Sequence, residues 1–281
     1  MNKINGYEIY TIQPNTIHPK ARVFMKTFFF DTKNDFKNRL VRVYIPSTYD
    51  FDDPNKRFKV IYMLDGKNLF DDYTSFVGEW HIDESIEKMI EDKVNDGYIV
   101  VGVDAPNTDM DRSLEMSPRE IERNKKYAYN LPGYADILAD FIFETVKPDI
   151  DNTFHTYSNY TGVAGSSMGG LMALYLALTY SKDIKFCLAF SPAIFLFKWN
   201  SFKKFLDKTV SKDLPKIFFY VGGQGFERVF VETTIRTYNY LINHGFSYEH
   251  VNLLIDTIRV HNEKAWGEYF PSMLLRIDNL F

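Results

Sequence analysis

One serine of the chain stands in a spacing that is typical of a catalytic nucleophile. Residues 165–169 read Gly-Ser-Ser-Met-Gly, a G-x-S-x-G pattern with Ser167 at its centre. In a nucleophile elbow the central serine occupies a strained turn between a strand and a helix, and the flanking glycines leave room for that turn. An apolar stretch at 161–165 precedes the pattern, and apolar residues at helical spacing follow it between 171 and 178. This context favours a nucleophile at Ser167 over an ordinary glycine-rich turn.

A serine hydroxyl needs an imidazole to accept its proton and a carboxylate to orient that imidazole. Of the six histidines, only His261 directly follows a predicted strand near the C-terminus, in the order serine, acid, histidine. Glu227 is the first carboxylate after the preceding strand at 216–221. It is therefore the preferred acid. Asp256, within the predicted last strand, and Glu232, within the predicted helix after Glu227, stay open as alternatives.

The tetrahedral intermediate of acyl transfer also needs two hydrogen-bond donors aimed at its oxyanion. The backbone N–H of Met168, directly after the serine, is the first candidate. The second is expected from the loop after the strand at 58–64, where Gly66 allows a tight turn that presents the N–H of Lys67 or, as a second choice, of Asn68.

Aromatic side chains follow the predicted strand at 186–190. Phe195 and Trp199 belong to this segment, SPAIFLFKWN, which is in the position of a loop that covers the acyl or alcohol pocket. They are candidates for the substrate pocket, as is Asn68, and for the two aromatic residues packing in the core is the alternative.

Segments with strand and helix patterns alternate along the chain. Two segments rich in aromatic and β-branched residues, 21–31 and 39–46, predict an antiparallel hairpin at the start. Further strands are predicted at 58–64, 98–104, 161–165, 186–190, 216–221 and 251–258, and helices at 79–93, 132–148, 229–244 and 266–280, besides the helix after Ser167. Pro148 is expected to end the second of these helices. The alternation predicts an α/β fold with a mostly parallel central sheet, an antiparallel N-terminal edge hairpin, and helices on both faces.

No linker divides the sequence, so a single domain is expected over residues 1–281. The polar, proline-punctuated segment 105–130 is expected to run over the surface near the active site. In parallel sheets, sites gather beyond the carboxyl ends of the strands, and this is where the elbow and His261 would meet.

The composition excludes several classes of protein. A net charge of −4 argues against a nucleic-acid or membrane partner, which needs a basic surface. The single cysteine, Cys187, excludes an internal disulfide and is expected to be a buried, inert thiol. His-x-x-x-His and Cys-x-x-Cys spacings are absent, so neither a metal nor another cofactor is expected. The N-terminus lacks the apolar core of a signal peptide, which indicates a cytoplasmic protein. The sequence does not determine the oligomeric state, so a homo-oligomer is an open alternative.

Several blocks of the sequence resemble those of a known esterase family of the α/β hydrolase superfamily, which includes enterochelin esterase-like, feruloyl esterase-like and S-formylglutathione hydrolase-like enzymes. The blocks occur in the family's order over roughly residues 39–275, and they are YMLDGKNLFDD (62–72), GEWHIDE (78–84), VVGVD (100–104), GSSMGGLMALYLAL (165–178), FSPAIF (190–195) and HNEKAW (261–266).

The resemblance implies an α/β hydrolase fold with Ser167 as nucleophile, His261 as base and the loop at Gly66-Lys67 as an oxyanion donor. It also implies that Arg112 and Glu115, in the segment DRSLEMSP, lie beside the site. The chain departs from the family at the acid. The family's carboxylate closely follows the glycine at the end of the strand, whereas GGQGF precedes Glu227 here.

The function expected from these residues is the hydrolysis of a small-molecule carboxylic ester through an acyl-enzyme on Ser167. An acyltransferase or a thioesterase would use the same residues with another acceptor or leaving group. A binding protein that has kept the hydrolase fold without catalysis is the alternative from a different class.

Overall fold

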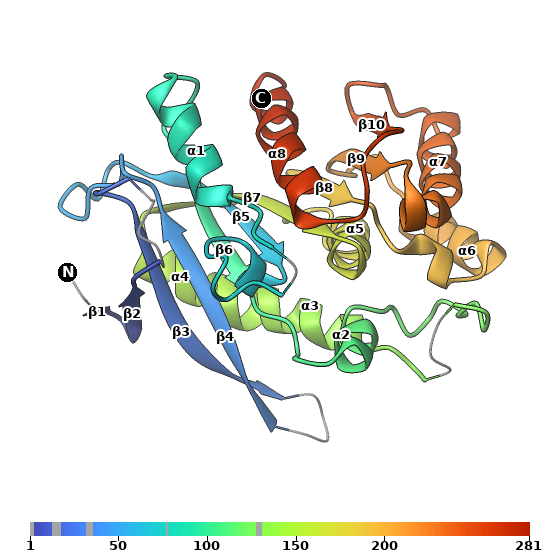
Figure 1. Cartoon of the computed structure of the whole chain (residues 1–281), viewed down its shortest axis with the longest axis horizontal. Coiled ribbons are helices and arrows are strands. Elements are labelled where there is room, and N and C mark those ends of the chain that lie inside the picture. Colours follow the sequence, from blue (N-terminus) through green and yellow to red (C-terminus); the bar gives the residue numbers. More distant parts are fainter. Residues whose placement is uncertain (1–2, 13–17, 32–35, 77, 128–130) are drawn as a thin grey trace.

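The computed structural model describes residues 3–12, 18–31, 36–76, 78–127 and 131–281. In this part of the chain ten strands form one sheet, in the order β1-β2-β3-β4-β6-β5-β7-β8-β9-β10 (Figure 1). The strands are β1 (Lys3–Ile4), β2 (Tyr7–Tyr10), β3 (Arg22–Asp31), β4 (Phe36–Ile45), β5 (Phe58–Leu64), β6 (Ile99–Val103), β7 (Thr156–Ser166), β8 (Phe186–Phe190), β9 (Lys216–Gly222) and β10 (Val251–Asp256).

The sheet is antiparallel in its N-terminal part and parallel in the remainder. β3 and β4 pair antiparallel from Arg22 opposite Ile45 to Asp31 opposite Phe36, which confirms the predicted hairpin. β4 joins β6 in antiparallel fashion, and the six strands from β6 to β10 in the sheet order are parallel to one another. The mostly parallel sheet predicted from the alternating pattern is confirmed.

The hairpin does not form the edge of the sheet, because β1 and β2 extend the sheet beyond β3. Tyr7 of β2 is fully buried, and its ring packs edge-on against Phe28 and Phe154. The other three residues of β2 are exposed or half-buried. Because Tyr7 is the one fully buried residue of β2, this strand lacks the alternation of apolar and polar residues by which strands are predicted. This explains why β2 was not predicted from the sequence.

Helices cover both faces of the sheet. α1 (Ile82–Glu91) and α8 (Glu263–Asp278) pack side by side on one face (Figure 1). The other face is covered by α3 (Ala135–Asp140), α4 (Lys147–Thr153), α5 (Met168–Thr179), α6 (Trp199–Thr209) and α7 (Arg228–Asn243), and α2 (Asp109–Glu115) contacts α3. None of the helices within the described ranges is long and apolar enough to cross a membrane.

The helix predicted over 132–148 begins later and continues past Pro148. α3, a π-helical segment (Phe141–Val146) and α4 follow one another without a break. The π turn shifts the backbone hydrogen-bond pattern by one residue, and Pro148 lies in the first turn of the α-helical bonding that resumes after it. A first-turn position tolerates a residue without an N–H, so the prediction that Pro148 ends the helix is wrong.

Part of the segment 105–130 is buried. Glu115, the last residue of α2, is fully buried and accepts two hydrogen bonds, of 2.6 and 2.7 Å, from the guanidinium of Arg39 on β4. Arg39 also donates to the backbone carbonyl of Asp104, at 2.5 Å. Residues 128–130 lie outside the described residues. The buried ion pair therefore ties α2, and the residues beside it, to the sheet.

Replacing one member of this pair is expected to destabilise the protein strongly. Glu115→Gln leaves the Arg39 guanidinium charged and buried without its counter-charge, which typically costs about 3 kcal/mol of unfolding free energy. Urea unfolding followed by circular dichroism measures the loss. The matched control is Asp136→Asn, which breaks a 2.6 Å ion pair with Arg119. In this pair the Asp136 side chain is 40% exposed and the Arg119 side chain 43%. That change is expected to cost less than about 1 kcal/mol. An unchanged midpoint for Glu115→Gln would contradict the structural role of the buried pair.

Candidate active site

Ser167 occupies the turn between β7 and α5 by itself. β7 ends at Ser166 and α5 begins at Met168. The φ and ψ of Ser167 are 57° and −117°, a region that residues other than glycine rarely adopt. A Cβ on Gly165 would lie 2.6 Å from the backbone of Gly169, so the close approach of strand and helix requires glycine there. The strand-turn-helix context predicted around Ser167 is confirmed.

Ser167 opens into a cleft beyond the carboxyl ends of the parallel strands. The loops after β5, β6, β7 and β10 contribute to the cleft, together with α2 and the first turns of α8. The lining combines charged, polar and aromatic side chains: Asp65, Lys67, Asn68, Phe76, Pro106, Asn107, Asp109, Arg112, Ser166, Ser167, His261, Glu263 and Trp266. The fold therefore brings Ser167 and His261 to the same cavity, as the order of the strands predicts.

Glu227 faces the imidazole of His261. Glu227 Oε2 lies 3.4 Å from His261 Nδ1, and the carboxylate is fully buried while the imidazole is 18% exposed. This distance exceeds that of an ordinary hydrogen bond. Among the described residues, however, neither atom has any other hydrogen-bond partner. Catalytic hydrogen bonds are often long in the absence of substrate, so the geometry suits a carboxylate that orients the ring.

The other oxygen of Glu227 is held by a buried chain of donors. Ser191 Oγ donates to Glu227 Oε1 at 2.5 Å, and Trp266 Nε1 donates to Ser191 Oγ at 3.1 Å. Ser191 directly follows β8 and is fully buried, with a φ of 42°. Because Oε1 is engaged in this way, Oε2 is left to face the imidazole. Sequence reasoning missed both Ser191 and Trp266, since neither belongs to a motif for this role.

Aromatic rings fix the plane of the His261 imidazole. Phe230 of α7 stacks on it with ring centroids 4.4 Å apart, and Trp266 of α8 meets it edge-on at 4.8 Å. The three rings come from three separate elements. The imidazole is thus confined by packing as well as by its contact with Glu227.

The other two carboxylates considered for the acid lie elsewhere. Asp256, at the end of β10, accepts a 2.5 Å hydrogen bond from Tyr269 and contacts Arg259. These partners, with the hydrogen bond from Tyr269 first, lower the pKa of Asp256. Glu232 is exposed on α7 and pairs with Arg236 one turn later. β10 ends two residues before the predicted boundary, so Asp256 is terminal rather than internal to its strand.

Two backbone amides lie at helix starts around the cleft. Met168 is the first residue of α5, and Lys67 belongs to a single 3-10 turn, η1 (Gly66–Asn68). N–H groups in such positions have no acceptor within their own helix. The N–H of Asn68 differs, because it donates to the carbonyl of Asp65 at 2.9 Å. Lys67 is therefore better suited than Asn68 to offer a free donor.

Asp65 holds this loop in place. Its carboxylate accepts two hydrogen bonds from the Arg112 guanidinium, at 2.6 and 2.7 Å. A Cβ on Gly66 would lie 2.6 Å from the backbone of Gly102 on β6, so η1 rests directly on the sheet. Arg112 lines the cleft as the resemblance implied, and its bidentate pair with Asp65 connects α2 to the loop after β5.

A second buried carboxylate lines the cleft and was not predicted. Glu263, the first residue of α8, is 8% exposed, and Asn68 Nδ2 donates to it at 3.3 Å. Burial and the nearby charge of Asp65 raise the pKa of Glu263, against the opposing effects of His261 and Arg112. Its position two residues after His261 was the one available signal.

Three residues proposed for the substrate pocket do not line the cleft. Glu115 is buried against Arg39, as described above. Phe195 packs on Phe230, with centroids 4.7 Å apart, and so supports the ring that stacks on His261. Trp199 is the first residue of α6, and the Cζ of Arg236 lies 5.7 Å from the centre of its indole ring. Phe195 and Trp199 thus take the packing role that was the alternative for them.

Solved structures of similar fold cover nearly the whole chain. The BES protein from Bacillus cereus has 20% identity and a TM-score of 0.67 over 93% of this chain and 95% of its own. A ferulic acid esterase has 17% identity and a TM-score of 0.67 over 93% and 99%. The siderophore hydrolase EstA from Aspergillus nidulans has 19% identity and a TM-score of 0.66 over 91% and 94%. No curated protein sequence matches the chain.

The fold is thus that of the α/β hydrolases, as predicted. A family model described as "Putative esterase" matches residues 36–277, which include the elbow, the loop after β5 and the loop after β10. This match covers most of the chain, and the chain belongs to this esterase family.

Proposed function

We propose that the protein is a serine esterase that hydrolyses a carboxylic ester through an acyl-enzyme on Ser167. The observation that carries this proposal is the pairing of two otherwise unpartnered buried atoms, Glu227 Oε2 and His261 Nδ1, beside the cleft that Ser167 lines. A binding protein would have no need to keep a buried acid facing an imidazole next to a strained serine.

In this reaction the Ser167 hydroxyl attacks the ester carbonyl carbon while His261 Nε2 accepts the hydroxyl proton. Glu227 accepts the Nδ1–H of His261, which fixes the orientation of the ring, and its negative charge stabilises the imidazolium that forms. The N–H groups of Met168 and Lys67 bind the oxyanion of the tetrahedral intermediate. His261 then protonates the leaving alcohol, and a water molecule activated by the same imidazole hydrolyses the acyl-enzyme.

The lining of the cleft favours a polar aromatic ester over a long acyl chain. Phe76 and Trp266 offer aromatic surfaces, while Lys67, Asp109 and Arg112 bring charge to the same cavity. Two solved structures of similar fold carry the names ferulic acid esterase and siderophore hydrolase, and ferulic acid is an aromatic compound. A panel of acetyl, feruloyl, siderophore and thioester substrates, with product analysis, separates these classes and detects acyl transfer.

Ser167→Ala is expected to lower turnover of an activated acetyl ester by about a thousandfold or more, because the nucleophile, base and acid act as a unit. Labelling by a fluorophosphonate probe should be lost with it. Thermal unfolding should change little, since the hydroxyl leaves no cavity at this half-exposed turn. Activity within a few-fold of wild type, or persistent labelling of the variant, would show that Ser167 is not the nucleophile.

Glu227→Gln is expected to lower kcat by about a thousandfold or more with a much smaller change in KM, because an amide cannot stabilise the imidazolium. Asp256→Asn and Glu232→Gln serve as matched controls that remove the other two carboxylates. Both should retain kcat within a few-fold of wild type. Steady-state kinetics of the three variants decide the acid, and a large loss in either control instead of Glu227→Gln would reassign it.

Ser191→Ala is expected to lower kcat by about tenfold, because Glu227 Oε1 loses its buried donor and the carboxylate is free to turn away from His261. KM should stay near the wild-type value. Thr237→Val is the matched control: it removes a fully buried hydroxyl that bonds the carbonyl of Thr233 on α7. If both variants lose stability equally and kcat equally, the role of Ser191 is only structural.

A further inference from the structure

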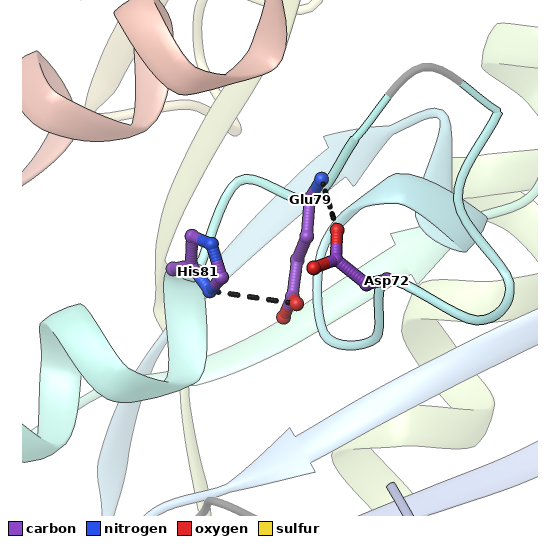
Figure 2. A group of neighbouring side chains, drawn as sticks. All are labelled: Asp72, Glu79 and His81. Atoms are coloured by element: carbon purple, nitrogen blue, oxygen red, sulfur yellow. Dashed lines mark hydrogen bonds and ion pairs between the residues drawn. The ribbon is translucent and has the colours of Figure 1, made fainter. Parts of the chain in front are cut away.

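A second cluster of polar side chains lies on the loop that leads into α1. Asp72, Glu79 and His81 each direct one ligand-type atom into a space where these atoms are within 4.8 Å of one another (Figure 2). Glu79, Asp83 and Glu84 form a second group of the same kind, so Glu79 belongs to both groups. None of these residues takes part in the hydrolysis proposed above.

Three carboxylates of this cluster, those of Asp72, Glu79 and Asp83, have no salt bridge to a lysine or arginine among the described residues. Within the described ranges, no lysine or arginine nitrogen lies within 4.0 Å of Asp72, Glu79 or Asp83. In the same part of the chain, the basic partner of Glu79 is the imidazole of His81, whose Nδ1 lies 3.4 Å from Glu79 Oε2 and 3.6 Å from Glu84 Oε1. Glu79 is only 7% exposed, and its Oε1 has no hydrogen-bond partner among the residues that the structure describes. A buried carboxylate oxygen without a partner is costly, and coordination of a metal ion is one way to offset that cost.

Asp83 forms the buried half of the cluster. It is fully buried in the first turn of α1, and one of its carboxylate oxygens lies within 4.8 Å of an oxygen of Glu79.

The other half opens to solvent in a geometry that suits a metal ion. Asp72 and His81 are both exposed, while Glu79 is at the buried end between them. Figure 2 shows the Glu79 carboxylate directed at the His81 ring, and the Glu79 N–H donates to Asp72 Oδ1 at 3.1 Å, which orients the Asp72 carboxylate. All three side chains line a cleft that is separate from the one at Ser167.

We propose that Asp72, Glu79 and His81 bind a divalent transition-metal ion, such as Zn²⁺ or Mn²⁺, with water completing its coordination. One imidazole nitrogen and two carboxylates form a mixed ligand set that these ions accept, whereas Mg²⁺ and Ca²⁺ favour oxygen ligands alone. The three ligands are separated in sequence by intervals that match no metal-binding motif, which explains why spacing alone did not reveal them.

The ion would join the turn after β5 to the start of α1. Trp80, between two of the ligands, packs on Trp266 with ring centroids 5.7 Å apart. The site therefore adjoins the residues that support Glu227 without touching the reacting atoms. Its role is to stabilise the loop, and no step of the proposed hydrolysis passes through it.

Calorimetric titration of the tag-free, full-length chain, stripped with a chelator, tests the site with Zn²⁺, Mn²⁺, Mg²⁺ and Ca²⁺ chlorides. Zn²⁺ or Mn²⁺ is expected to bind at one ion per chain and, at a hundredfold excess over Kd, to raise Tm by about 5 °C. Glu79→Gln should weaken binding at least tenfold. Glu91→Gln, at an exposed carboxylate on the same helix, should bind as the wild type does.

Three results would overturn the proposal: no binding of any of the four ions by the wild type, equal binding by Glu79→Gln and wild type, or binding of Mg²⁺ or Ca²⁺ as tight as that of Zn²⁺ and Mn²⁺. Asp72→Asn and His81→Ala change exposed side chains and keep the test decisive should Glu79→Gln fail to fold. Each of these two variants is also expected to weaken binding at least tenfold.

Discussion

The arrangement of the site depends on a single constraint, which is that the carboxylate of Glu227 is completely buried. A buried carboxylate must have both oxygens satisfied, or its desolvation costs several kcal/mol. One oxygen is satisfied by Ser191, itself held by Trp266 from α8. Among the described residues, the second oxygen faces the imidazole of His261 and has no hydrogen-bond partner. The requirement to satisfy a buried charge thus selects the orientation of the histidine.

Satisfying this charge draws together elements that are distant in sequence. Ser191 follows β8, Glu227 ends the turn after β9, and His261 lies in the loop between β10 and α8. The parallel register of β8, β9 and β10 brings these three loops to one edge of the sheet. On the other side of Ser167, the pair between Asp65 and Arg112 holds the loop after β5 in the same way. The sheet supplies the common edge, and buried polar pairs fix the loops upon it.

Much of the fold could be predicted from local pattern. The strands expected at 58–64 and 186–190 agree residue for residue with β5 and β8, because each is a short run in which all residues except Lys59 are apolar. The order of the strands was enough to bring Ser167 and His261 to one cleft. The helix through Pro148 could not be predicted in this way, since its π turn has no simple sequence pattern.

The supporting residues could not be predicted for a different reason. Ser191, Glu263 and Trp266 act through contacts between loops, and such contacts have no spacing in the sequence. The choice between Glu227 and Asp256 as the acid also depended on where each side chain points, and not on the order of the two residues in the sequence alone. Each follows or ends a strand at the same edge, but the turn at 225–227 directs Glu227 inward while Asp256 is taken up by Tyr269. Sequence order thus identified the candidates, and three-dimensional packing distinguished between them.

The backbone at Ser167 has an evolutionary consequence. At a φ of 57°, a side chain branched at Cβ is strongly disfavoured. Threonine, which carries the same hydroxyl and is one nucleotide change away from serine, is therefore disfavoured by conformation even though its chemistry would be suitable. Unbranched side chains such as cysteine escape this restriction. The range of nucleophiles that this position can acquire by mutation is therefore set by the shape of the turn before any question of reactivity arises.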